Sequence, residues 1–344
     1  MIKQIAKLPR RSLGCFPTPL IEAKHLSAVL NGPRILIKRD DLTGLALGGN
    51  KCRRLEFLIG DALQKGFDSF LISGIGNMST QLAAACAKLG IKARHIVQGD
   101  FSPKEKQGNY VLHKILNSDI RVNSDIMVME VSGPVETLDD VKANINFVLD
   151  SEVLKLRDEG YNPFAIRDWQ SPIVDNAGWV NAVDEIWQQL KAQDIEAQYL
   201  VVTSSEGATL AGLIVGAKYL RAPFKVIGIS NLYKKAKAIS EVVRISNETA
   251  EFLALGINIM LDEVTIYDEY VGDGYGNITK ECIEAIKLVT QTEGFFLDPE
   301  YTGKAMAGLI DLIRKGLFTS EDTVVFIHTG GIPSLFVYHE ELTS

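Results

Sequence analysis

The 344-residue sequence lacks several features that define specialised classes of protein. No window of about 18 residues is apolar and uncharged, so we predict no membrane span, and no long apolar core follows the N-terminal residues to indicate a signal peptide. Basic residues do not predominate, since 36 Lys and Arg stand against 43 Asp and Glu, giving a net charge of −7. This balance argues against a nucleic-acid partner, which would need a basic face.

Cysteine is also scarce, with four residues far apart in the chain: Cys15, Cys52, Cys86 and Cys282. No C-x-x-C pair and no Cys/His cluster occurs, so the sequence predicts neither a metal site nor a disulfide framework. Scattered thiols of this kind fit a reducing compartment, and we therefore expect a cytoplasmic protein.

The length and the apolar pattern predict an α/β protein of two domains. A chain of 344 residues exceeds the roughly 250–300 residues at which single cores tend to split. Apolar runs typical of buried strands alternate with segments of helical periodicity, which favours open, mostly parallel sheets flanked by helices. No shift in composition marks a boundary, so we expect the domains to interleave. We predict strands at 34–41, 69–73, 93–97, 125–131, 162–166, 198–203, 224–230 and 323–327, and helices from 51 and at 81–89, 109–116, 135–156, 181–191, 210–220, 280–292 and 303–315.

Lys51 lies where a predicted strand passes through a glycine pair into a predicted helix. The junction reads LGGNK (47–51), and apolar residues then recur at helical spacing. A helix start carries partial positive charge and free N–H groups, which favours a neutral amine over an ammonium. A neutral amine can attack a carbonyl carbon, so Lys51 is a candidate nucleophile. A solvated surface lysine is the alternative, and the short motif alone leaves both open.

Two further loops follow predicted strands and are rich in Gly, Ser and Thr. The loop TSSEGAT (203–209) precedes a helix and offers N–H groups and hydroxyls suited to a phosphate, with Glu206 expected to turn outward. The loop SGIGNMST (73–80) has two glycines of an incomplete dinucleotide fingerprint, and it suits a small carboxylate equally well. Ser79 or Thr80 is expected to cap the helix that follows. By themselves, both loops also suit ordinary turns.

A last loop, HTGGIPS (328–334), follows the final predicted strand, and two tyrosines lie in other glycine-containing turns. We interpret His328 as a hydrogen-bonded structural residue. Tyr275 lies in GDGYG (272–276) and Tyr301 in DPEYTGK (298–304), where a phenol could relay a proton or simply pack. Because ligands of open parallel sheets bind beyond the carboxyl ends of strands, we expect the loops near positions 51, 76, 206 and 330 to gather around one site.

Taken together, these segments resemble one family. The chain looks like the fold-type II pyridoxal 5'-phosphate (PLP) enzymes, which are similar to the tryptophan synthase β-chain, and within them the D-cysteine desulfhydrase and 1-aminocyclopropane-1-carboxylate (ACC) deaminase group. The resemblance implies PLP as cofactor, a homodimer, a large PLP-binding domain of residues 1–52 and 165–344, and a small domain of residues 53–164. The matching segments span nearly the whole chain: FPTPL (16–20), KRDDLTG (38–44), GGNKCRRLEF (48–57), AGLIVG (211–216), GYG (274–276), EGFFLDPEYTGKAMAGL (293–309) and FIHTGG (326–331).

The resemblance also implies roles for individual residues. Lys51 would form an imine with the cofactor aldehyde and shuttle a proton, and Tyr275 and Tyr301 would face the substrate. The substrate carboxylate would be received by the loop residues Gly76, Asn77, Met78, Ser79 and Thr80. The cofactor would be held, besides Lys51, by Asn50 at its ring hydroxyl, by Ser205, Glu206, Gly207, Ala208 and Thr209 around its phosphate, and by Thr302, Thr329 and Gly330 towards its pyridine nitrogen.

Two positions bear on the activity. Thr302 stands where the ACC deaminases have a glutamate and the desulfhydrases a threonine, and a neutral hydroxyl near the ring nitrogen would favour simple β-elimination. The loop at 75–78 is one residue shorter than the family pattern, so that Gly76 aligns nearest to a missing serine. The segment 168–171 also stands where relatives have a glycine-rich turn.

We therefore predict a PLP-dependent lyase acting on a small amino acid. The first choice is β-elimination from D-cysteine or a related β-substituted amino acid, which gives pyruvate and ammonia. The alternatives are a β-replacement synthase, an ACC deaminase-like protein that has lost that activity, and a PLP-binding protein without chemistry. A nicotinamide-dependent enzyme is the weakest alternative because its fingerprint is incomplete. The exact substrate and its stereochemistry are not revealed by the sequence.

Overall fold

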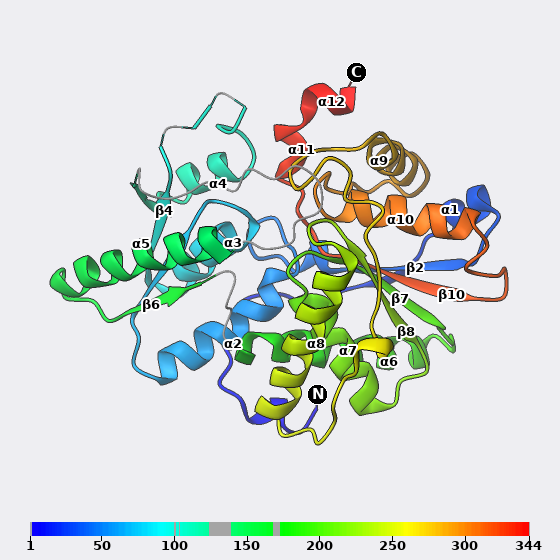
Figure 1. The fold of residues 1–344 in the computed structure, drawn as a ribbon, viewed down its shortest axis with the longest axis horizontal. Helices are drawn as coiled ribbons and strands as arrows, with labels where there is room; N and C mark the ends of the chain where they lie inside the picture. The colour runs from blue at the N-terminus through cyan, green and yellow to red at the C-terminus, as the bar shows by residue number, and fades with distance from the viewer. Residues whose placement is uncertain (1, 100, 103, 124–138, 168–172, 344) are drawn as a thin grey trace.

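A computed structural model describes residues 2–99, 101–102, 104–123, 139–167 and 173–343, and within these residues the strands form two sheets (Figure 1). The larger sheet has six strands and the smaller has four, and every pairing is parallel except that of β1 with β2. In spatial order the larger sheet contains β1 (Leu20–Glu22), β2 (Arg34–Arg39), β10 (Thr323–His328), β7 (Tyr199–Ser204), β8 (Lys225–Ser230) and β9 (Thr265–Tyr267). The smaller sheet contains β5 (Asp119–Val122), β4 (Lys92–Val97), β3 (Ser69–Ser73) and β6 (Pro163–Ile166).

Helices cover both faces of the larger sheet, as Figure 1 shows. Leu200 and Val325 pack into one core with α6 (Ala177–Ala192), α7 (Ala208–Leu220) and α8 (Lys235–Phe252). Ile37 and Val324, which point to the opposite face, pack with α1 (Lys24–Leu30), α9 (Lys280–Glu293) and α10 (Thr302–Arg314). Because both faces are buried, these strands are apolar at successive positions rather than at alternate ones.

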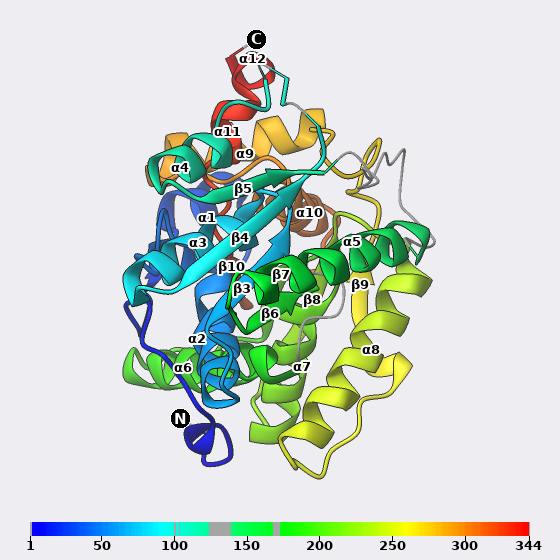
Figure 2. The same ribbon diagram turned by 90° about the vertical axis from the view of Figure 1, so that its left-hand side faces the viewer.

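The smaller sheet is covered in the same way (Figure 2). Phe70 and Ile72 of β3 pack with α2 (Lys51–Gln64) and α3 (Asn77–Leu89), whereas Leu71 packs with α5 (Asp139–Asp158). The remaining α-helices of the described residues are α4 (Asn109–Ile115), α11 (Ser334–Val337) and α12 (His339–Thr343). The predicted α/β class, with two mostly parallel sheets flanked by helices, is confirmed. No helix in the described part of the chain has the length and apolar character needed to cross a membrane.

The predicted strands and helices that fall within the described residues are present, with small differences in their ends. The strand predicted at 125–131 and the segment 168–171 lie outside the described residues. Seven strands and α-helices of the described residues were not predicted: β1, α1, β5, α8, β9, α11 and α12. The expectation that Ser79 or Thr80 caps α3 is wrong, because the helix begins at Asn77 and its N-cap residue is Gly76, which offers no side chain.

The predicted domain boundaries at 52/53 and 164/165 remain a prediction, but two elements bear on them. The strand β6 pairs with β3 of the smaller sheet as far as Ile166, so the boundary at 164 falls within a strand. The helix α2 begins at Lys51, so the boundary at 52 falls within its first turn.

Candidate active site

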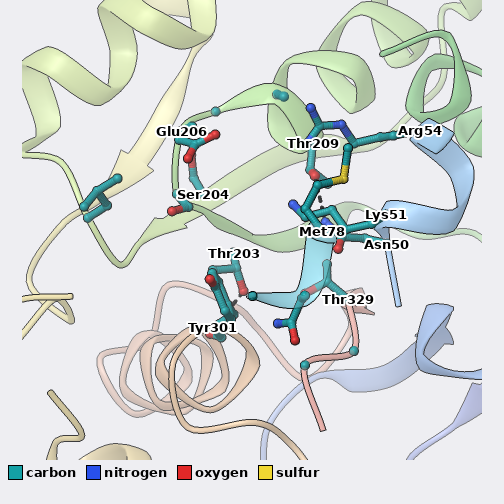
Figure 3. Close-up of a pocket in the computed structure, with 18 of the residues that line it drawn as sticks. Asn50, Lys51, Arg54, Met78, Thr203, Ser204, Glu206, Thr209, Tyr301 and Thr329 are labelled. Carbon is teal, nitrogen blue, oxygen red and sulfur yellow. Dashed lines mark hydrogen bonds between the residues drawn. The ribbon is translucent and has the colours of Figure 1, made fainter. Parts of the chain in front are cut away.

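A cavity of about 280 Å³ lies beyond the carboxyl ends of β7 and β10, where α2, α3 and α7 begin (Figure 3). It brings together the four loops predicted to meet, which confirms that expectation. The smaller sheet contributes the start of α3, and the larger sheet contributes the loops after β7 and β10. The lining consists of Asn50, Lys51, Arg54, Gly76, Asn77, Met78, Thr203, Ser204, Ser205, Glu206, Gly207, Ala208, Thr209, Leu232, Tyr275, Tyr301, Thr329, Gly330 and Gly331.

Lys51 is held in the cavity by contacts between three loops. The backbone N–H of Asn50 donates to the carbonyl of Thr329 at 2.9 Å, and its side-chain Nδ2 donates to Thr209 Oγ1 at 3.2 Å. A Cβ atom at Gly330 would lie 2.6 Å from Gly49 Cα, so the two loops approach as closely as glycines permit. The glycine pair before Lys51 is therefore explained by close packing as well as by the turn.

The smaller sheet is joined to the same loop through α3. Gln81 Nε2 donates to the carbonyl oxygen of Gly48 at 3.0 Å. The position of Lys51 thus depends on residues from both sheets.

The loop 203–209 ends in a helix start that no side chain caps. Gly207 is the N-cap residue of α7, with φ +97, and a Cβ there would lie 2.8 Å from Val242 Cγ2. The hydroxyl oxygen of Ser204 is buried in the cavity wall and has no hydrogen-bond partner among the described residues. Backbone N–H groups and an unpaired hydroxyl at one helix start form a binding site for an anion.

Glu206 lies in this loop, and the expectation that it turns outward is wrong, because it lines the cavity (Figure 3). Desolvation by burial raises the pKa of its carboxyl, although the charges of Lys51 and Arg54 act in the opposite direction. Arg54 is ion-paired with Asp175, with 2.7 Å between Nη2 and Oδ2. Burial therefore favours the neutral form of Glu206 beside a site for an anion.

Tyr275 and Tyr301 meet at the cavity edge. Their hydroxyl groups form a hydrogen bond, and their rings are edge-to-face with centroids 6.0 Å apart. Burial raises the pKa of both hydroxyls well above the usual value. Thr203 Oγ1 fixes the backbone of Tyr301 by donating to its carbonyl at 3.1 Å. Both phenols therefore keep their protons at neutral pH and can donate one.

Three residues predicted for the site do not line the cavity. Ser79 Oγ donates to the carbonyl of Gly76 at 3.0 Å, and Thr80 Oγ1 donates to Asn109 Oδ1 at 3.0 Å. Thr302 is fully buried, and its hydroxyl donates to Asp298 Oδ1 at 2.6 Å. The structure thus gives no support to a Thr302 hydroxyl beside the cofactor ring.

Two lining residues, Arg54 and Leu232, lie outside every predicted site loop, whereas Thr203, Ser204 and Gly331 lie in the loops 203–209 and 328–334. Arg54 follows Lys51 by three positions and so shares its helix face, which is a usable pattern. Leu232 lies after β8, and no sequence pattern around it indicates a position in the site.

His328 is a structural residue, as predicted. It is fully buried, its Nε2 lies 2.7 Å from the carbonyl of Phe296, and its Nδ1 accepts from the N–H of Gly330 at 3.2 Å. Burial lowers its pKa, so the ring is neutral with the proton on Nε2. Nowhere in the described ranges do three or more His, Cys, Asp or Glu side chains form a group that could hold a metal ion.

Comparison with known proteins decides the family. The model of a family described as pyridoxal-phosphate dependent enzyme matches residues 11–330. The chain belongs to this family. A D-cysteine desulfhydrase of Klebsiella pneumoniae (strain 342) is 36% identical over 347 residues, covering 99% of this chain and 99% of that protein. A putative 1-aminocyclopropane-1-carboxylate deaminase of Pyrococcus abyssi (strain GE5 / Orsay) is 36% identical over 340 residues, covering 98% of this chain and 96% of that protein.

Solved structures of other proteins have the same fold. An ACC deaminase homologue superimposes with a TM-score of 0.85 at 34% identity, covering 100% of this chain and 99% of that one. The processed form of threonine deaminase isoform 2 from Solanum lycopersicum superimposes with a TM-score of 0.68 at 17% identity, covering 99% and 92%, and shows the same fold. The predicted fold type II, the PLP cofactor and the assignment as a PLP-dependent lyase are thereby confirmed.

The cavity fits pyridoxal phosphate on its own chemistry. A phosphate needs several hydrogen-bond donors, and the uncapped start of α7 with the unpaired Ser204 hydroxyl supplies them. An aldehyde needs an amine, and Lys51 lines the same cavity.

Proposed function

We propose that this enzyme eliminates the β-substituent of D-cysteine or a related small β-substituted amino acid. With water, D-cysteine would give pyruvate, ammonia and hydrogen sulfide. The observation that carries the proposal is a single cavity that joins Lys51, an anion-binding helix start and a pair of protonated tyrosines. The name of the Klebsiella relative, D-cysteine desulfhydrase, supports the same substrate class.

We assign the cofactor contacts on the donors that face the cavity. Lys51 would bind the aldehyde, Asn50 the ring hydroxyl, and the segment 204–209 the phosphate. Thr329 and Gly330 would lie along the ring. Glu206 would remain neutral in the phosphate loop, and Thr302 would act only by fixing the turn at Asp298, since its hydroxyl is occupied there.

The substrate would lie between Lys51, α3 and the tyrosines. The start of α3 has no side-chain cap, so the N–H groups near Gly76, Asn77 and Met78 would bind the substrate carboxylate. The bound cofactor supplies an electron sink for the charge that develops at Cα. Lys51 Nζ would take the proton from substrate Cα, and the pair Tyr275–Tyr301 would donate a proton to the departing sulfur.

Turnover of a panel of amino acids tests this proposal. Purified holoenzyme is given D- and L-cysteine, other β-substituted alanines and ACC, and the oxo acid product is assayed. We expect pyruvate from at least one D-β-substituted amino acid, and none from the Lys51→Ala variant. No product from any member of the panel refutes the proposal.

A β-replacement synthase is the second candidate, and the loop at Gly76 favours it. A Cβ at Gly76 would meet no atom within 4 Å, so there is room beside the substrate for a second nucleophile. This candidate predicts turnover only when a thiol or amine nucleophile is added to the assay.

We further propose a cytoplasmic homodimer with the domain division predicted from the sequence. The four cysteines are free thiols, which suits a reducing compartment. Light scattering of the purified protein during size-exclusion chromatography tests the dimer, and a monomeric mass contradicts it.

A further inference from the structure

The turn that carries Tyr275 is rich in glycine and is held by side chains from outside the turn. Gly272, Gly274 and Gly276 have φ angles of +68, +121 and +80, so glycines set its path. The buried ammonium of Lys304 donates to the carbonyl of Val271 at 2.7 Å and to that of Gly274 at 2.9 Å. One end of the turn is thereby fixed to α10.

Tyr338 holds the other end. This residue lies between α11 and α12, is 7% exposed, and directs its hydroxyl to the carbonyl oxygen of Gly276. The same hydroxyl lies 3.1 Å from Glu300 Oε1. A phenol has one proton and a carbonyl can only accept, so Tyr338 donates to Gly276. The contact between Tyr338 Oη and Glu300 Oε1 is then a hydrogen bond only when Glu300 is protonated and donates its proton to Tyr338 Oη.

The surroundings of Glu300 favour that proton. Burial raises its pKa to about 7, and the charge of Asp298 in the same turn adds to the effect. The hydrogen bond that Tyr338 can donate to the ionised carboxylate and the charge of Lys304 on α10 act in the opposite direction. The other titratable groups that face Glu300 are Tyr275 and Tyr301, which stay neutral.

We propose that Glu300 and Tyr338 are positioning residues that hold Tyr275 against Tyr301, and that loss of the proton from Glu300 releases this hold. A carboxylate is a stronger acceptor than a carbonyl, so the ionised Glu300 draws the proton of Tyr338 away from Gly276. The glycine-rich turn then loses one of its two anchors. The consequence for turnover rests on the proposed function, whereas the consequence for the turn does not.

Amide hydrogen exchange of the holoenzyme tests the hold directly. We compare protection of residues 271–277, corrected for intrinsic exchange rates, between pH 6 and 8.5. In the wild-type protein, protection should fall as pH rises through neutrality. Tyr338→Phe should show low protection at every pH. Glu300→Gln cannot ionise and can still donate to Tyr338, so its protection should stay high throughout.

Kinetics provide the second readout. Tyr338→Phe should lower kcat by about fivefold with little change in KM, which is the loss expected for one neutral hydrogen bond. In the wild-type enzyme kcat/KM should fall at alkaline pH, and Glu300→Gln should remove this fall. The matched control is Tyr219→Phe, which loses a hydroxyl that accepts from Gln4 Nε2 at 3.0 Å, far from the cavity, and should change neither readout.

The outcomes separate the two proposals. Wild-type protection of residues 271–277 in Tyr338→Phe, or an unchanged pH dependence in Glu300→Gln, overturns the positioning role. A wild-type enzyme that turns over no amino acid refutes the proposed function, while the exchange data still decide the hold on the turn.

Discussion

Replacing Gly330 with alanine should weaken both the fold and the cofactor site. Gly330 has φ +89, where an alanine costs about 1–2 kcal/mol relative to glycine. Its new methyl group would lie 2.6 Å from Gly49 Cα, and separating the two loops costs about 1–3 kcal/mol in a packed interior. The free energy of unfolding should therefore fall by about 2–5 kcal/mol.

Gly160 provides a matched control. Its φ is +91, nearly that of Gly330, but a Cβ there would meet no atom within 4 Å. Gly160→Ala therefore carries the backbone cost alone, about 1–2 kcal/mol. The difference between the two variants isolates the contact between the two loops. Urea unfolding of the cofactor-free proteins measures both values, and equal losses would refute the argument from close approach.

Of these two variants, only Gly330→Ala should alter the cofactor site. The displaced loop carries Thr329, whose carbonyl accepts the N–H of Asn50 at 2.9 Å, and Asn50 precedes Lys51. We expect weaker binding of pyridoxal phosphate by Gly330→Ala in an absorption titration, with Gly160→Ala unchanged.

Three further predictions concern single side chains. Ser204→Ala should weaken PLP binding by about tenfold or more, because its unpaired buried hydroxyl would donate to a charged phosphate; unchanged affinity in the titration contradicts this. Asn109→Leu should raise KM and leave kcat near its original value, because Asn109 Nδ2 donates to Asn77 Oδ1 at 2.9 Å and orients it for the substrate; steady-state kinetics decide. Burial lowers the pKa of His95 to about 3 and that of His113 to about 4, so the unfolded chain binds protons below pH 6.5 that the native protein does not. The free energy of unfolding should therefore fall by about 1.4 kcal/mol for each pH unit of acidification and for each histidine. His95→Phe should remove one of the two contributions, as measured by urea unfolding at several pH values; an unchanged slope against pH contradicts this.

The sequence predicted the elements with long apolar runs or faces, and it missed elements that are short or that bury few large apolar residues. The buried positions of α8 include Ala238, Ser246 and Thr249, which are small or polar. Val242 is the one large aliphatic residue among its buried positions, so few large apolar side chains mark its buried face, although the helix packs closely. The strand β5 lies at the edge of the smaller sheet with two exposed residues, and no apolar run marks it.

The site was predictable to the level of the loop but not of the side chain. Loops rich in Gly, Ser and Thr after buried strands gather as expected for a parallel sheet. Within a helical turn, however, successive residues point about 100° apart, so Tyr301 faces the cavity while Thr302 bonds Asp298 behind it. Tyr338 was not predicted, because its contact with Gly276 joins residues far apart in the sequence.

The position of β10 has a consequence for biosynthesis. This strand is among the last elements of the chain, yet it lies between β2 and β7 in the middle of the larger sheet. A nascent polypeptide therefore cannot complete the middle of this sheet, or place Thr329 beside Asn50, until residues 323–329 have been synthesised. The cavity wall formed by Thr329, Gly330 and Gly331 is likewise absent until β10 has joined the sheet, and a chain that terminates before residue 323 leaves an apolar gap between β2 and β7.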